Sequence, residues 1–189
     1  LETPVAGFVG QNKGFFFMKR YKVATIFVDH YSCLSYVHLQ HSTKGDETLL
    51  AKRAFETYAA SFGVVVCQYH ADNGRFAEKL FLDHAAGHGQ GVSLCGVNAH
   101  FQNGLAKKRI RDLSERGRTS LLHALNRWPS AISVHLGPYA LRYCDDVLNA
   151  TPSIKSRHSP LEAFSSAPVH SNILNLHPPF CPAYALLSG

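Results

Sequence analysis

Apolar, β-branched runs alternate with segments of helical spacing along most of the chain. The apolar runs predict four strands, at residues 21–29, 34–40, 64–70 and 92–95. Helical spacing predicts four helices, between residues 44 and 63, 75 and 88, 105 and 126, and 130 and 149. The short turn His30–Cys33 between the first two strands predicts a hairpin. This order predicts an α/β fold, with a mixed sheet that carries helices on both faces.

Local signals mark where several of these helices begin and end. Asp46 and Glu47 suit the positive N-terminal end of the first helix, and Gly63 suits its C-terminal end. Trp128-Pro129 ends the long third helix, because proline lacks the amide that the helix needs. The expected apolar side of that helix comprises Ile110, Leu113, Leu121, Ala124 and Leu125. Its basic side chains lie mostly elsewhere: Lys107, Lys108, Arg111 and Arg118.

The composition changes after residue 150. Residues 151–189 hold most of the nine prolines, one short helix candidate from Pro160 to Phe164, and no sustained period. We therefore predict a core at residues 1–150 and a proline-rich C-terminal tail or linker at residues 151–189.

Charge and cysteine usage narrow the class of protein. The formal net charge is +6 and the isoelectric point about 9.1, which favours nucleic acid as a partner. No apolar run approaches the roughly 18 residues of a membrane span, and the first residues lack the pattern of a signal peptide. The five cysteines form no CxxC pair, which indicates reduced, buried thiols in an intracellular protein.

Asp72 is the strongest single candidate for chemistry. It stands where an apolar strand ends and the turn Asp72-Asn-Gly74 begins. Open α/β sheets bind ligands at the carboxyl ends of their strands, and a carboxylate there can bind a divalent cation. The alternative is that Asp72 only shapes the turn.

A second possible metal site is formed by two histidines. His84 and His88 are four residues apart on a predicted helix, a spacing that can hold a metal ion. No cysteine pair or carboxylate is spaced to complete the site, so exposed helix histidines are the favoured interpretation.

Several motifs occur together at matching separations. Tyr69-His-Ala-Asp-Asn-Gly-Arg-Phe76 is followed by Asn98-Ala-His-Phe-Gln-Asn-Gly-Leu-Ala106 and Arg109-Ile-Arg-Asp-Leu113. Phe27-Val-Asp-His-Tyr-Ser32, Asn149-Ala-Thr-Pro152 and Ser159-Pro-Leu-Glu-Ala-Phe164 also fit. Together these motifs resemble the integrase catalytic core of copia-type retrotransposons, and more loosely retroviral integrases and DDE transposases, which share an RNase H-like fold.

The resemblance implies a metal-dependent polynucleotidyl transferase for DNA integration. In that family three acidic residues hold two Mg²⁺ or Mn²⁺ ions, which activate the attacking oxygen and stabilise the leaving one. The second acid of the family matches Asp72. The position of the third, a glutamate, is occupied here by Lys107. The first acid falls just upstream of the segment that matches Leu1, so we expect the first strand to be largely missing from this chain.

Other acids do not replace the two that are missing. Asp29 matches a hairpin position that is not a metal ligand in the family, and its local interpretation is a turn cap. An RNase H-like nuclease using Asp29 and Asp72 stays as an alternative. Asp112 lies about 140° around the helix from Lys107 and about 7 Å along it, and Glu115 lies about 12 Å away. Neither can reach the same ion at about 2.1 Å.

These features predict a chain without strand-transfer activity. A lysine at position 107 supplies no oxygen ligand, and at about 4 Å it would attract Asp72 by roughly 4 kcal/mol. Weak, salt-dependent DNA binding can remain, so the alternative is a non-catalytic nucleic-acid-binding relic. The DNA-binding candidates are Asn73, Gln102, Asn103, Lys107, Lys108, Arg111 and Arg118. The resemblance also implies homo-oligomers and, for action on chromosomal DNA, a nuclear location.

Overall fold

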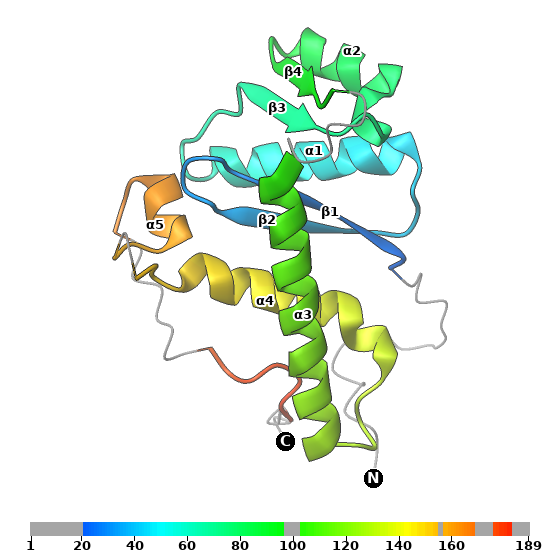
Figure 1. Cartoon of the computed structure of the whole chain (residues 1–189), viewed down its shortest axis with the longest axis vertical. Coiled ribbons are helices and arrows are strands. Elements are labelled where there is room, and N and C mark those ends of the chain that lie inside the picture. The colour runs from blue at the N-terminus through cyan, green and yellow to red at the C-terminus, as the bar shows by residue number, and fades with distance from the viewer. Residues whose placement is uncertain (1–20, 97–102, 155–156, 169–175, 183–189) are drawn as a thin grey trace, which may run out of the picture.

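The computed structural model describes residues 21–96, 103–154, 157–168 and 176–182. Its elements in chain order are β1 (Val23–Val28), β2 (Ser35–Gln40), α1 (Gly45–Ala60), β3 (Gln68–Ala71), η2 (Arg75–Ala77), α2 (Lys79–Gly87), β4 (Gly91–Leu94), α3 (Gly104–Arg127), η4 (Val134–Leu136), α4 (Gly137–Ala150) and α5 (Pro160–Ser165). The arrangement in Figure 1 is the predicted α/β class.

The predicted hairpin is confirmed. β1 and β2 pair antiparallel, with Val23 opposite Gln40 and Val28 opposite Ser35. Successive side chains of a strand point to opposite faces, so the hairpin has two faces to bury.

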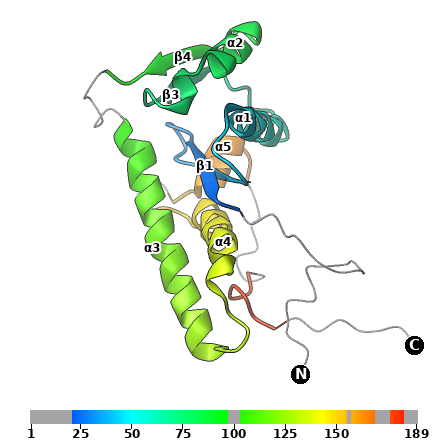
Figure 2. The same cartoon turned by 90° about the vertical axis from the view of Figure 1, so that its right-hand side faces the viewer.

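Helices cover both faces of this hairpin. On one face Phe27 stacks on Phe55 of α1, with ring centroids 4.8 Å apart. On the other face the hairpin packs against Leu113 of α3 and Cys144 of α4. The hairpin residues in this second cluster are Ala24, Ile26, Val37 and Leu39. β1 accordingly lies between α1 and α3 (Figure 2).

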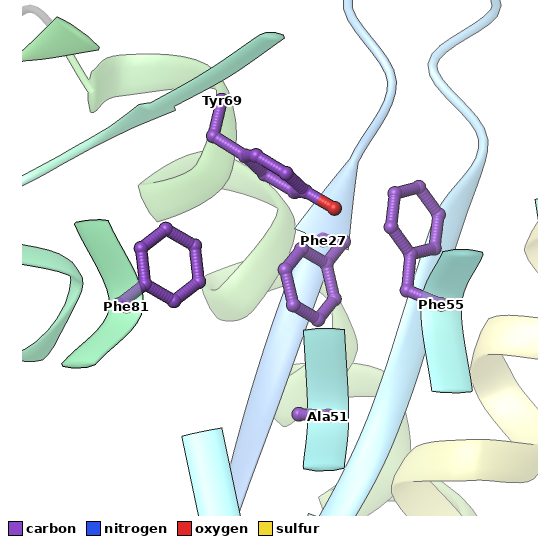
Figure 3. Close-up of a cluster of buried hydrophobic side chains, with 5 residues drawn as sticks. All are labelled: Phe27, Ala51, Phe55, Tyr69 and Phe81. Atoms are coloured by element: carbon purple, nitrogen blue, oxygen red, sulfur yellow. The ribbon is translucent and has the colours of Figure 1, made fainter. Parts of the chain in front are cut away.

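A cluster of buried aromatic side chains joins the hairpin to the rest of the chain. It consists of Phe27, Ala51, Phe55, Tyr69 and Phe81 (Figure 3). These residues come from β1, α1, β3 and α2, so α1 is the common layer on which the other elements rest. Burying one such ring contributes roughly 1.5–3 kcal/mol.

The strands do not form the single mixed sheet that we predicted. Within the described residues, β1 pairs only with β2, and β3 pairs only with β4, in parallel. The predicted strand at residues 64–70 is shortened to Gln68–Ala71, because the four residues of β4 pair only with these. The result is two small sheets that lie over α1.

A buried polar network fixes the second sheet to α1. The side chain of Lys52 is fully buried. Its ammonium group donates to Glu56 Oε1 at 2.7 Å and to Gln90 Oε1 at 2.6 Å. The Tyr69 hydroxyl of β3 donates to the same Glu56 oxygen at 2.9 Å. Burial raises the pKa of Glu56, but hydrogen bonds from Lys52, Gln90 and Tyr69 outweigh burial and leave the pKa below its ordinary value.

α3 packs along α4 through one stripe of its surface. Leu113, Gly117 and Ala124 are buried, and a Cβ at Gly117 would lie 3.5 Å from the backbone nitrogen of Leu141. The predicted apolar side is therefore only partly right, because Ile110 and Leu125 are 46% and 40% exposed.

Two predicted helix boundaries are wrong. The last core helix begins at Gly137 rather than near residue 130, with Pro138 in its first turn, where a missing amide costs nothing. The helix predicted at residues 75–88 is divided by Glu78, whose extended backbone separates η2 from α2. The ends at Gly63 and before Trp128 are as predicted: Gly63 has a φ of +74°, and α3 ends at Arg127.

Part of the predicted tail packs on the core. α5 begins with a capping box in which the Ser159 hydroxyl accepts from the Glu162 amide and the Glu162 carboxylate accepts from the Ser159 amide. Phe164 is buried beside Leu34 and Ala59. Residues 159–165 are thus packed, while the proposed boundary at residue 150 stays a prediction.

The structure tests the expectation that the cysteines are free and buried. All five cysteines are free, and Cys95 and Cys144 are buried, but Cys67 is exposed, contrary to our expectation of buried thiols. Among the described residues, no helix combines the length and the apolar character that crossing a bilayer requires.

Candidate functional site

A cavity of about 640 Å³ lies between the hairpin, the segment that leads into β3, and the start of α3. Its lining includes residues 26–30, residues 64–71, and Asn103, Leu105 and Ala106. The fold therefore brings the carboxyl end of β3 and the amino end of α3 to the same place.

Asp72 directly follows β3, as the sequence predicted, and comes next to the cavity-lining Ala71. The turn that carries it is fixed by Asn73, whose Nδ2 donates to the Cys95 carbonyl oxygen at 2.9 Å. The Cys95 amide donates in turn to the Ala71 carbonyl at 2.8 Å. Asp72 Oδ1 lies 3.3 Å from the place of a Cβ at Gly74, so a side chain there would crowd the carboxylate.

Lys107 lies on the first turn of α3. It follows the cavity-lining Ala106 and is exposed. The helix is held against the hairpin turn by Arg109, whose Nη2 donates to the Cys33 carbonyl oxygen at 2.7 Å. The expected neutralisation of Asp72 by Lys107 stays a prediction.

Asp29 also lines the cavity, but its carboxylate closes the hairpin turn. Its Oδ2 accepts from the Ser32 amide and from the Ser32 hydroxyl, both at 2.7 Å. The Asp29 carbonyl oxygen accepts from the Cys33 amide at 3.0 Å. The predicted turn-capping role is confirmed.

The donor set at the cavity does not fit a pair of divalent cations. Over the described residues, no group of three His, Cys, Asp or Glu side chains is placed to hold a metal ion. Lys107 offers an ammonium instead of an oxygen ligand. Asp112 and Glu115 follow it on α3, with Glu115 exposed. We therefore derive no chemical step through a metal.

Four of the basic residues of α3 lie on one side of the helix: Lys107, Lys108, Arg111 and Arg118. At 100° per residue, Lys107, Arg111 and Arg118 fall within about 40° of one another, and Lys108 lies about 100° from Lys107. All four side chains are exposed. This face, which we call the α3 basic face, points away from the buried stripe of Leu113, Gly117 and Ala124.

The other DNA-binding candidates are placed differently. Asn103 lines the cavity, and the amide of Asn73 is engaged with the Cys95 carbonyl. Gln102 lies outside the described residues.

The two histidines at helical spacing do not converge on an open metal site. The rings of His84 and His88 stack with centroids 4.3 Å apart. His84 Nδ1 lies 3.1 Å from Lys52 Nζ, and its Nε2 lies 3.2 Å from Arg53 Nε. Desolvation first, and these cations second, lower the pKa of His84. Both ring nitrogens face positive charge, which disfavours a cation there.

A second buried polar network, between β2 and α4, was not predicted from the sequence. Asn149 of α4 accepts from the Ser35 amide at 3.0 Å and donates to the Ser35 carbonyl at 2.6 Å. The Ser35 hydroxyl donates to Asp145 Oδ1. Burial is the main reason that the pKa of Asp145 rises to about 7. Asn149 did stand in a recognised motif, but nothing in that motif indicated a partner in β2.

Comparisons with known proteins agree with this architecture. No family model and no curated protein matches the chain. Among solved structures, the trimeric form of the HTLV-2 integrase catalytic core domain with magnesium has a TM-score of 0.54 at 17% identity, covering 75% of this chain and 83% of that one. The dimeric form gives 0.50 at 16% identity, with the same coverage.

A third similar structure is the simian T-cell lymphotropic virus intasome in complex with the PP2A regulatory subunit B56 gamma. It has a TM-score of 0.56 at 16% identity, covering 86% of this chain and 53% of that chain. At these identities the likeness shows the fold: the chain has the RNase H-like architecture of retroviral integrase cores, as the sequence predicted.

Proposed function

We propose that the chain is a retroelement integrase core of the copia type that no longer catalyses strand transfer. One observation supports the proposal: the cavity is lined both by Ala71, which precedes Asp72 at the end of β3, and by Ala106, which precedes Lys107 on the first turn of α3. Those are the two places at which the family resemblance puts an acid. The shared fold with retroviral integrase cores supports the same descent.

The loss of activity follows from charge and from ligand chemistry. Mg²⁺ and Mn²⁺ require oxygen ligands, and two ions with a DNA phosphate between them need several carboxylates. Asp72 supplies one carboxylate, and Lys107 brings a positive charge to the position where the family has its glutamate. In a longer chain, a strand ahead of Leu1 would supply the first acid, and Lys107 would still oppose the second ion.

A direct test measures end joining by the purified chain. We expect no joined product from blunt-ended retroelement oligonucleotides with 10 mM of either Mg²⁺ or Mn²⁺, an arbitrary excess. Joined product that disappears in Asp72→Asn would refute the inactive assignment.

A restoration experiment tests the descent itself. The chain is lengthened at its N-terminus by a strand that carries an aspartate, and Lys107→Glu is introduced. We expect Mn²⁺-dependent end joining from this variant and none from the matched Lys107→Gln variant, which removes the positive charge but adds no carboxylate. End joining by both the Lys107→Glu and the Lys107→Gln variant contradicts the assignment of position 107. So does the absence of end joining by Lys107→Glu in two chains that differ in the added N-terminal strand.

A second candidate is a non-catalytic module that binds DNA. The exposed α3 basic face favours it, because clustered Lys and Arg side chains bind phosphates without needing a metal. Asp72→Asn distinguishes the candidates, because it abolishes any restored end joining while leaving DNA affinity unchanged.

Homo-oligomers and a nuclear location belong to the integrase proposal and are tested by light scattering and by imaging of a tagged chain.

The nuclease alternative requires Asp29 as a metal ligand. Both Asp29 and residues next to Asp72 border the cavity, but Asp29 Oδ2 already accepts two hydrogen bonds from Ser32. We expect Mn²⁺ affinity, measured by calorimetry, to be the same in Asp29→Asn as in the unaltered chain. A loss of affinity in Asp29→Asn, with the thermal midpoint kept, would favour the nuclease.

A further inference from the structure

Strand register brings a thiol, an imidazole and a hydroxyl to one face of the second sheet. β3 and β4 pair in parallel with His70 opposite Ser93, so these two side chains lie on the same face. The ladder continues one residue beyond β4, where the Cys95 amide donates to the Ala71 carbonyl at 2.8 Å. Cys95 comes two residues after Ser93 and therefore projects to the same face as His70. We call these three residues the Cys95 triad.

The hydrogen bonds of the triad fix the tautomer of His70. The Ser93 hydroxyl has one hydrogen, which it donates to the Tyr69 carbonyl oxygen at 3.4 Å. Ser93 Oγ lies 2.8 Å from His70 Nδ1 and accordingly accepts the hydrogen of Nδ1. A neutral imidazole with its hydrogen on Nδ1 has a lone pair on Nε2. His70 Nε2 lies 3.6 Å from Cys95 Sγ, so the Cys95 thiol donates to His70.

This order is that of a nucleophile, a base and an orienting group. A thiol is activated when an adjacent base takes its proton, and a third group that holds the base in place completes the arrangement. Cys95 is the nucleophile, His70 is the base, and Ser93 orients the ring. Cys67 provides the contrast within the same chain. It is exposed, and its thiol donates to the Val65 carbonyl at 3.6 Å, an acceptor that is not a base.

Burial decides which electrophiles can reach the sulfur. Cys95 is 4% exposed, whereas the neighbouring His70 is exposed at the surface of the sheet. A bulky reagent cannot touch the sulfur without moving the strands. Hydrogen peroxide is little larger than water, and it oxidises thiols to sulfenic acid. The triad therefore suits a small peroxide better than any large electrophile.

We propose that Cys95 is a peroxide-reactive thiol, with His70 as its base and Ser93 as the group that orients the base. Cys95 Sγ attacks one oxygen of hydrogen peroxide, so that an S–O bond forms and the O–O bond breaks. The thiol proton passes to His70 Nε2 and then to the leaving hydroxide, which departs as water. The sulfur is oxidised to sulfenic acid while the peroxide is reduced. The reaction needs neither DNA nor a metal, so it goes beyond the proposed integrase function.

The test treats the full chain with hydrogen peroxide and then unfolds it in dimedone, which labels sulfenic acids. Peptide mass spectrometry measures the label on each cysteine. We expect Cys95 to be oxidised at least tenfold faster than Cys67, although Cys67 is the more exposed. A bulky aromatic disulfide in place of peroxide should modify Cys67 first, because access then decides the order. Oxidation of Cys67 by peroxide as fast as that of Cys95, or no oxidation of Cys95, overturns the proposal.

Variants of the triad separate activation from packing. His70→Asn keeps a polar side chain but supplies no base, so we expect the oxidation rate of Cys95 to fall at least tenfold while that of Cys67 is unchanged. Ser93→Ala removes the orienting group and should cause a smaller fall. His88→Asn, at an exposed position next to α2, is the matched control and should keep the parental rate.

Thermal midpoints show whether a variant acts through its fold. We expect His70→Asn and Ser93→Ala to keep the midpoint of the parent, because the face that carries both side chains is not part of the aromatic cluster. If His70→Asn lowers the midpoint, Ser93→Ala decides the outcome. A Cys95 oxidation rate that stays at the parental value in a folded triad variant, or that falls as far in His88→Asn, refutes the proposal.

Discussion

At the scale of single residues, Asp145 links stability to pH. Burial raises its pKa to about 7 from an ordinary value of 3.8, with Asp146 adding to the shift and the Ser35 hydrogen bond opposing it. A carboxyl group whose pKa is raised by folding stabilises the protein fully below about pH 4, and this contribution is lost as the pH rises through about 7.

We expect Asp145→Asn to abolish this loss. Relative to the parent, the variant should gain a few kcal/mol of unfolding free energy between pH 4 and 8, at about 1.4 kcal/mol per unit of pKa difference. Urea denaturation at both pH values measures it. The exposed Asp83→Asn is the control and should follow the parent. A pH dependence of stability in Asp145→Asn equal to that of the parent would contradict the assignment.

Asn149 tests the neighbouring contact between α4 and β2. Its side chain satisfies both the amide and the carbonyl of Ser35, and the residue is 6% exposed. We expect Asn149→Ala to cost about 2–4 kcal/mol in chemical denaturation, because two buried backbone groups lose their partners. Asn126→Ala, at an exposed position of α3, should stay within about 0.5 kcal/mol. A neutral Asn149→Ala would show that water replaces both bonds.

At the scale of elements, α1 holds the second sheet through Lys52. The Lys52→Met variant keeps the length of the side chain but removes the ammonium that Glu56 and Gln90 accept from. We expect a loss of about 3 kcal/mol, since Glu56 is left partly buried without its cation. Hydrogen exchange should accelerate in β3 and β4 more than in the hairpin. The exposed Lys79→Ala is the control, and uniform acceleration over both sheets would contradict this role.

The same scale shows which features the sequence could predict. Periodicity predicted the strands and core helices of the described residues, with errors at several of their ends. The end of a predicted strand indicated Asp72, whereas only the family resemblance indicated Lys107. Periodicity failed where the length of a strand depends on its neighbouring strand. Residues 64–67 were predicted to be part of a strand, but β4 pairs only with Gln68–Ala71. Arg109 and Asn149 were missed as structural links, because their backbone partners lie 76 and 114 residues away in the chain.

At the scale of the whole molecule, the net charge of +6 favours nucleic acid as a partner, and the exposed α3 basic face is our candidate for the contact. We expect duplex DNA to bind weakly and with equal affinity for unrelated sequences, because phosphate contacts carry no sequence information. Affinity should fall steeply between roughly 50 and 200 mM salt as counterions are released.

A triple variant assigns that binding to α3. Lys108→Ala, Arg111→Ala and Arg118→Ala together remove up to three phosphate contacts, so the slope of log affinity against log salt should become shallower by about 2.7. Arg116→Ala is the matched control, because Arg116 is exposed on the same helix but lies about 140–160° around it from Arg111 and Arg118. Its slope should match the parent, as anisotropy titrations at several salt concentrations would measure. If the triple variant keeps the parental slope, DNA binds to another surface, and the α3 basic face is only a solvated flank of the helix.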